Sequence, residues 1–289
     1  DLEAPRMGWQ PVKTGLILLL MTSLLVACSR VDLAYRNLDR LIPWRLDQYL
    51  ALDAEQKRWL KPRLQNQLQW HCSAELPRYI DWLQRSEQLF LADPEPQQLL
   101  ARFAEFDSAI DRLYRQITPD AIDLLQGLSP EQVEHLRQAM DRRNQEDHQK
   151  YVEPPAATLL SQRSARMENR LRPWLGSLNS TQQAHVQAWA QRLESQSPLW
   201  LDNRRHWQEL LLDSLQHRQQ ADFAERVRPL LEERERFYTE PYRQAASNSR
   251  QALAQLFSDL LASAEAEQRQ RLSKRLADLR EDLEGQRCG

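Results

Sequence analysis

Cys28 is the residue of this chain whose surroundings indicate a definite reaction. Lys13 supplies a positive charge, Leu16 to Ala27 form a short apolar run, and the small Ala27 directly precedes the cysteine. A peptidase that removes a leader requires a narrow side chain at that position. The run is too short to span a bilayer, which takes about 20 apolar residues. The sequence therefore predicts a cleaved leader over residues 1–27, of which residues 1–6 precede a plausible start at Met7.

This segment resembles the lipobox of bacterial lipoproteins. The resemblance implies a diacylated Cys28 thiol and an acylated new amino terminus, with palmitate as a typical chain. One acyl chain binds a membrane only marginally, at about 0.8 kcal/mol per buried methylene, whereas two or three chains anchor almost permanently. Ser29 stands where an Asp often retains such proteins at the inner membrane, so it favours the outer membrane. The alternative is a plain secretory signal that ends on a chance cysteine.

Other reactive residues do not form a recognisable catalytic or metal pattern. His71, Cys72 and Glu75 lie close together, and Glu131 and His135 are spaced for one helix face. The chain has no His-Glu-x-x-His, no Cys-x-x-Cys, no Gly-x-Ser-x-Gly and no Gly-rich phosphate loop. We therefore expect no catalytic residues, no metal and no cofactor, and predict that the protein is not an enzyme.

The composition predicts an all-α fold. Leu, Ala, Gln, Arg and Glu dominate, glycine occurs only 6 times, and no alternating run of β-branched residues appears. The 39 basic and 41 acidic side chains are interleaved, which argues against a nucleic-acid partner, because that would require a clustered basic face. We expect a multi-helix bundle of about ten helices after the leader.

Proline positions divide the predicted helices. A helix over Val31–Ile42 is expected to end at Pro43, with a short segment Trp44–Leu50 after it, and Thr118-Pro119 is expected to start a separate short helix. A polar run followed by Pro154-Pro155 predicts a boundary between an N-terminal half, 28–152, and a C-terminal half, 153–289. The two halves could also pack as one continuous domain.

Two cysteines remain once Cys28 carries lipid. Cys72 and Cys288 could pair in an oxidising periplasm. The alternative is a free, buried Cys72, since it continues the apolar stripe of Leu60, Leu64 and Leu68.

A five-residue phrase recurs at helix starts. It reads Leu, a capping residue, two others and Gln, at Leu52–Gln56, Leu128–Gln132 and Leu178–Gln182, with a degenerate fourth copy at Glu265–Gln268. Simple helix capping explains the phrase, because the cap side chain and the Gln satisfy each other's backbone amides. The phrase also resembles the Leu-Thr-x-x-Gln motif of periplasmic chaperones of the Spy and CpxP type, which implies a role in envelope stress.

A longer pattern covers nearly the whole chain after the leader. It resembles a family of uncharacterised lipoproteins of Gram-negative bacteria, and implies a lipid-anchored helical periplasmic domain without supplying an activity. The segments that carry it are Tyr35–Asp39, Pro43–Tyr49, the capped phrase at Leu52–Gln56, Trp70–Cys72, Glu75–Tyr79, Arg142–Asn144, Trp174–Leu178 and Trp207–Gln208.

The segment nearest the anchor is our candidate ligand site. It holds Tyr35, Asp39, Trp44, Asp47 and Tyr49, which could line a groove for a peptide or glycan, because Tyr and Trp bury area while keeping a polar group. In the alternative, the two aspartates pair with nearby arginines and lock the first helices together.

These observations leave three functional hypotheses. The first is a non-enzymatic, lipid-anchored module that contacts envelope proteins at the periplasmic face of the outer membrane. The second is a periplasmic chaperone or envelope-stress protein, and the third is an enzyme acting on an envelope polymer. The expected partners are the membrane, through the lipid, and envelope proteins.

Overall fold

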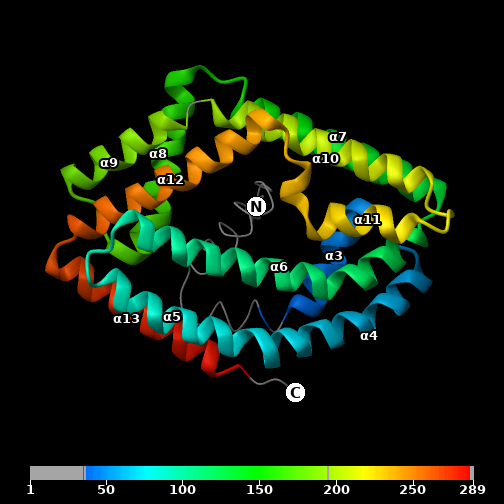
Figure 1. The fold of residues 1–289 in the computed structure, drawn as a ribbon, viewed down its shortest axis with the longest axis horizontal. Helices are drawn as coiled ribbons and strands as arrows, with labels where there is room; N and C mark the ends of the chain where they lie inside the picture. The colour runs from blue at the N-terminus through cyan, green and yellow to red at the C-terminus, as the bar shows by residue number, and fades with distance from the viewer. Residues whose placement is uncertain (1–34, 36, 194, 287–289) are drawn as a thin grey trace, which may run out of the picture.

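A computed structural model describes residue 35, residues 37–193 and residues 195–286. Every regular element within these ranges is a helix, which confirms the predicted all-α fold (Figure 1). The predicted leader, Cys28 and Cys288 lie outside the described residues.

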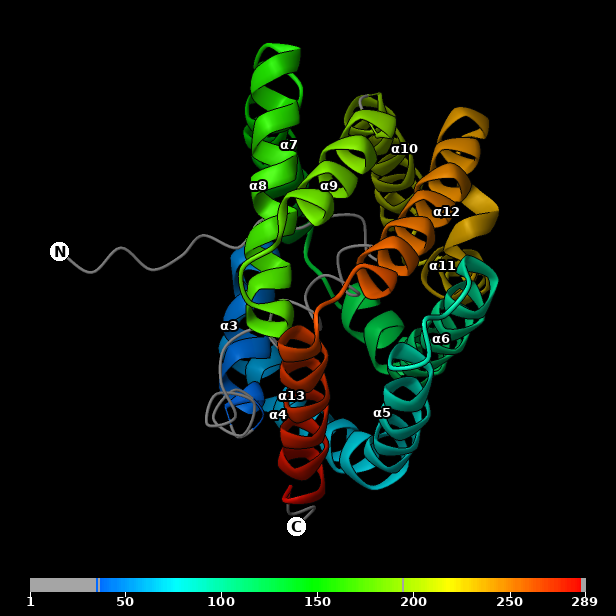
Figure 2. The same ribbon diagram turned by 90° about the vertical axis from the view of Figure 1, so that its left-hand side faces the viewer.

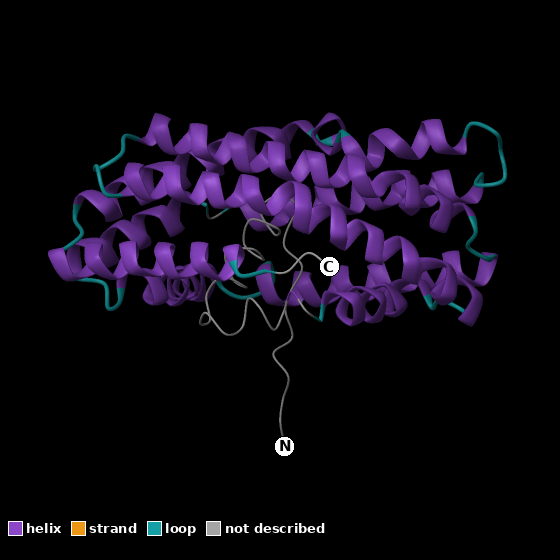
Figure 3. Cartoon of the chain, turned by 90° about the horizontal axis from the view of Figure 1, so that it is seen from below, coloured by secondary structure: helices purple, strands orange, loops and turns teal. Residues whose placement is uncertain are grey.

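Most helices run close to the long axis of the molecule (Figure 3). In chain order they are α3 (Leu38–Leu50), α4 (Ala54–Trp70), the π-helical turn η1 (His71–Glu75), α5 (Leu76–Phe90), α6 (Pro96–Gln126), α7 (Pro130–Tyr151), α8 (Ala156–Leu175), α9 (Ser180–Arg192), α10 (Gln196–Gln216), α11 (Phe223–Glu232), the 3₁₀ turn η2 (Arg234–Phe237), α12 (Glu240–Ala262) and α13 (Ala266–Glu284).

The same order of elements occurs twice. Each repeat begins with one helix, which is followed by a capped phrase and a long helical stretch. After a turn come a second long stretch, another capped phrase and a last helix. The first repeat runs from α3 to α7 and the second from α8 to α13. The contacts correspond as well: α3 packs on α4 and α7, as α8 packs on α9 and α13. The break at Val152–Pro155 separates the two repeats along the chain.

Each repeat packs its last helix against the other repeat. The helix α7 lies along α10, and α13 lies along α5 at the opposite end of the molecule (Figures 1 and 2). Between them α6 contacts both α11 and α12. This reciprocal packing of the last helices resembles the exchange of equivalent elements between the two subunits of a dimer.

Both principal cores contain residues from the two repeats. The first core combines Leu52, Leu128 and Leu136 with Leu215 and Phe223 of the second repeat. The second core places Leu83 among residues of α8, α9, α12 and α13. Burial of apolar surface is the main favourable term in folding, so the two repeats stabilise each other.

Two predicted helix boundaries are wrong. The helix α3 continues through Pro43, and α6 continues through Pro119. A proline inside a helix has no N–H to donate to the carbonyl four residues earlier. For Pro43 this is the carbonyl of Asp39, which is exposed and can bond to water instead. In α6, Thr118 and Ile122 are buried on either side of the proline, so tertiary packing holds one helix across it.

Cys72 is buried and disulfide-bonded, so the alternative of a free thiol is wrong. We predict that its partner is Cys288. The helix α13 runs antiparallel to α5, because Arg269 bonds Asp93 and Ser273 bonds Glu87. Cys288 lies 15 positions beyond Ser273 and Cys72 lies 15 positions before Glu87, and this equal spacing is the basis of the prediction.

Replacing Cys288 by Ser should lower the free energy of unfolding by about 2–4 kcal/mol, the usual contribution of a disulfide that closes a long loop. Urea unfolding with and without reductant measures it. The wild-type chain should lose this stability in reductant, and Cys288→Ser should be insensitive to it. A non-reducing peptide map that joins Cys72 to another cysteine would contradict the prediction.

Candidate functional site

Several residues of the family-like pattern meet at the π-helical turn η1. The amide of Leu76 donates to the carbonyl of His71, five residues back, so the helix holds one extra residue per turn here. Such turns often occur at functional sites. The Tyr35 hydroxyl lies 3.2 Å from His71 Nδ1, and the ring of Tyr79 packs edge-on against His71 at 5.5 Å between centroids.

Glu75 is fully buried beside this turn and is compensated by arginine. Arg112 of α6 donates from Nε and Nη2, each at 2.9 Å, and Arg78 adds a contact of 3.1 Å. A bidentate arginine gives a carboxylate strong, oriented hydrogen bonds. Glu75 therefore joins η1 to α6 as a structural ion pair.

Burial keeps the rings at η1 neutral. Desolvation lowers the pKa of His71 from 6.5, and the charge of Glu75 opposes this only in part. Burial also raises the pKa of Tyr35 and of Tyr79 to about 12 each. At neutral pH the docking of Tyr35 on His71 is thus a contact between uncharged groups.

These shifts predict that the fold loses stability on both sides of neutral pH. The unfolded chain binds the His71 proton at its ordinary pKa of 6.5 and the folded chain binds it less tightly, so stability should fall as pH drops through 6.5. The tyrosines hold their protons more tightly when folded, so stability should fall again as pH rises from about 10 towards 12.

Urea unfolding between pH 5 and pH 8 tests the predicted loss of stability at acidic pH. His71→Gln removes the titrating ring and should flatten the pH dependence in that range, whatever its effect on stability at pH 8. An unchanged slope in His71→Gln would show that another group causes it.

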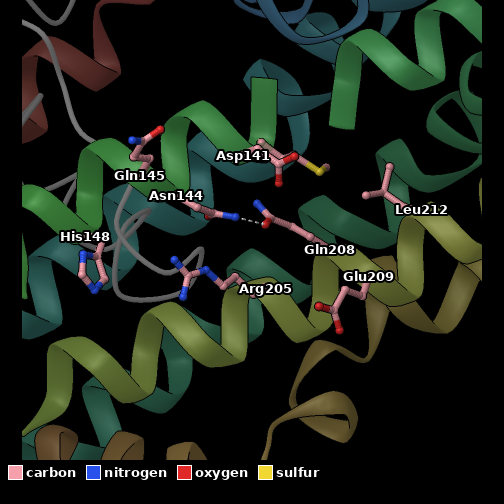
Figure 4. A pocket seen from close by; sticks show the side chains of 9 residues that line it. Asp141, Asn144, Gln145, His148, Arg205, Gln208, Glu209 and Leu212 are labelled. Atoms are coloured by element: carbon pink, nitrogen blue, oxygen red, sulfur yellow. Dashed lines mark hydrogen bonds between the residues drawn. The ribbon is translucent and has the colours of Figure 1, made fainter. Parts of the chain in front are cut away.

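A recess of about 340 Å³ lies between α7 and α10 (Figure 4). Asn144 donates to Gln208 Oε1 at 2.7 Å across it. The family-like segments Arg142–Asn144 and Trp207–Gln208 therefore meet at this place. The recess is lined by Met140, Asp141, Asn144, Gln145, His148, Arg205, Gln208, Glu209 and Leu212. Amides, carboxylates and cations together suit a polar ligand that both donates and accepts hydrogen bonds.

A buried ion cluster supports this recess. Asp147 is 1% exposed and accepts from Arg143 at 2.8 Å and from Arg204 at 2.7 Å. Arg204 also donates to Asn144 Oδ1 at 2.9 Å, and its guanidinium stacks on Trp200. Burial lowers the pKa of Arg204, and Asp147 opposes that effect. The cluster fixes the position of Asn144, and through it that of Gln208.

The five residues of the candidate ligand site point to different neighbours. Tyr35 contacts His71, Asp47 pairs with Lys57 of α4 at 3.0 Å, and Tyr49 packs against the first core. The ion pair of Asp47 joins α3 to α4, as in the alternative in which the aspartates lock the first helices together, but its partner is a lysine and not an arginine.

Asp39 and Trp44 are exposed on α3. None of the five lines the recess between α7 and α10.

The four capped phrases meet in pairs, and we call these pairs the glutamine junctions. In the first, Gln56 Nε2 donates to Gln132 Oε1 at 3.0 Å, and Gln132 Nε2 donates back at 2.7 Å. In the second, Gln182 and Gln268 exchange the same two bonds at 2.9 and 3.0 Å. Each glutamine also accepts from the backbone amide of its own cap residue, which confirms the predicted capping.

Sequence reasoning missed Arg112, Arg204 and Arg205, because each looks like one of many arginines on polar helix faces. No local signal separates them from solvent-exposed neighbours. Asn144 and Gln208 did carry a signal, since both stand in the family-like segments.

The fold defines this protein as an all-helical chain of two interlocked repeats. It belongs to a family of unknown function, DUF6279, whose family model matches residues 48–243. No curated protein and no solved structure matches the chain.

Among the residues that the structure describes, no helix is both long and apolar enough to cross a membrane. No cluster of three or more His, Cys, Asp or Glu side chains there could hold a metal ion.

Proposed function

We propose that this protein is a non-enzymatic, lipid-anchored module that binds other envelope proteins at the periplasmic face of the outer membrane. The observation that carries the proposal is the ordered signal of Lys13, the apolar run to Ala27, and Cys28. Lipid on Cys28 would confine the helical body near the bilayer and raise its effective concentration for neighbouring proteins.

The recess between α7 and α10 supports a binding role. Its lining combines amides and charges of both signs with the apolar Met140 and Leu212, a mixture that suits a polar segment of a partner protein. The ion cluster beneath it holds part of this lining in place before a partner arrives, which reduces the entropy cost of binding.

Mass spectrometry and cell fractionation test the anchor. The peptide that begins at Cys28 should carry acyl chains, and the protein should sediment with the outer membrane. Cys28→Ser should shift it out of the membrane fraction. An unmodified thiol in the native material would end the proposal.

Site-specific photocrosslinking tests the partner. A photoreactive residue at Gln145, which lines the recess, should give a discrete protein adduct in cells. The same residue at Gln97, exposed at the start of α6, should not. Failure of the Gln145 probe to capture any protein would count against a role in protein contacts at this recess.

A second candidate function is that of a periplasmic chaperone. It is favoured by the glutamine junctions, because the recurring phrases that resemble a chaperone motif make specific contacts with one another beyond capping. The purified protein should then suppress aggregation of an unfolded client. No suppression at equimolar amounts would exclude this function.

A further inference from the structure

We propose that the exposed face of α3 formed by Arg40, Leu41 and Trp44 lies on the bilayer surface, as a second membrane contact beside the lipid. This inference rests on the proposed anchor at Cys28. It assigns a partner, the anionic lipid headgroup region, to a surface that is exposed among the described residues.

Exposure singles out this face. Trp44 is 60% exposed and Leu41 is 47% exposed, and among the described residues Leu91 is the one other large apolar side chain in this class. Leu41 and Trp44 stand three residues apart on a helix, so they share one side of α3. Scattered exposed apolar residues are ordinary, whereas a pair on one face near an anchor indicates a contact surface.

The anchor keeps this face close to the membrane. Tyr35 stands seven positions after Cys28, and an extended chain spans about 3.3–3.6 Å per residue, so Tyr35 can lie no more than roughly 25 Å from the lipidated residue. Tyr35 is itself fixed on α4 and η1 through His71 and the carbonyl of Leu68. The start of α3 therefore cannot move far from the bilayer.

The chemistry of the face suits an interface. Tryptophan concentrates at the headgroup level of membranes, where its ring is apolar and its N–H remains hydrated. Arg40 is exposed next to Leu41, and a long basic side chain can place its charge at lipid phosphates while its stem covers apolar surface.

Photolabelling of the lipidated full-length mature protein tests the contact. The protein is reconstituted in vesicles of phosphatidylethanolamine and phosphatidylglycerol that contain a phospholipid with a diazirine near the glycerol. Trypsin then releases the peptide Leu41–Arg45, which holds both apolar residues, and the peptide Ser86–Arg102, which holds Leu91. We expect several-fold more lipid adduct on the first peptide than on the second.

A matched variant and an internal readout make the result decisive. The double variant Leu41→Asn, Trp44→Gln should lose most of the adduct from this segment while Cys28 remains acylated. Equal labelling of the two wild-type peptides on a chain shown to be acylated overturns this inference and leaves the proposed anchor intact. An unacylated Cys28 in the same digest refutes the proposed anchor, and the inference falls with it.

Discussion

Gln182→Glu should lower the free energy of unfolding by about 3 kcal/mol or more, although it changes a single atom of the side chain. Gln182 is fully buried, and its Nε2 donates to Gln268 Oε1 and to the carbonyl of Leu260. A carboxylate has no N–H to donate, so it would be buried against these two oxygens. Chemical denaturation at pH 7 measures the loss.

The same substitution at Gln98 is the matched control. Gln98 also accepts from the amide of its cap residue, Glu95, but it is exposed. A glutamate can accept that bond equally well, so Gln98→Glu should change stability by less than about 0.5 kcal/mol.

Lowering the pH should protonate the carboxylate introduced by Gln182→Glu, restore one donor and recover part of the lost stability. Equal losses in Gln182→Glu and Gln98→Glu would show that the glutamines act only as caps.

Asp147→Asn should lower the free energy of unfolding by about 3–5 kcal/mol, because it removes the negative charge from a buried ion cluster. Asp147 is the carboxylate that both Arg143 and Arg204 contact, and their side chains are only 19% and 14% exposed. An asparagine would also direct an N–H group at one of these donors. Thermal or urea unfolding measures the change.

Glu146→Gln removes a carboxylate that contacts the same Arg143, at 3.1 Å, but is 65% exposed. A surface pair of this kind contributes little, so the loss should stay below about 1 kcal/mol. Photocrosslinking at Gln145 should also weaken in Asp147→Asn, since Asn144 would lose its fixed position. A small effect of Asp147→Asn on stability would contradict the role of the cluster.

The capped phrases show where sequence reasoning ends. Each phrase predicted a helix start correctly, because the cap and the glutamine interact within four residues. That Gln56 meets Gln132, and Gln182 meets Gln268, depends on how distant helices pack. The degenerate copy at Glu265–Gln268 was the hardest to recognise, yet its glutamine occupies the place that Gln132 holds in the first repeat.

The prolines are a second case in which tertiary packing, and not the local sequence, decides the structure. Pro43 and Pro119 predict breaks by local rules, and burial on both sides of Pro119 overrides the local rule in α6. Tertiary packing, which contributes most of the stability of a helix in a protein, decides such cases.

The sequence by itself determined the all-α class and the helix caps, because composition and capping act over a few residues. Only the tertiary structure revealed the interlocked repeats, the buried carboxylates Glu75 and Asp147, and the recess between α7 and α10. These features bring together side chains that stand far apart along the chain. The sequence alone does not distinguish an arginine that binds a buried carboxylate from an arginine that is exposed to solvent.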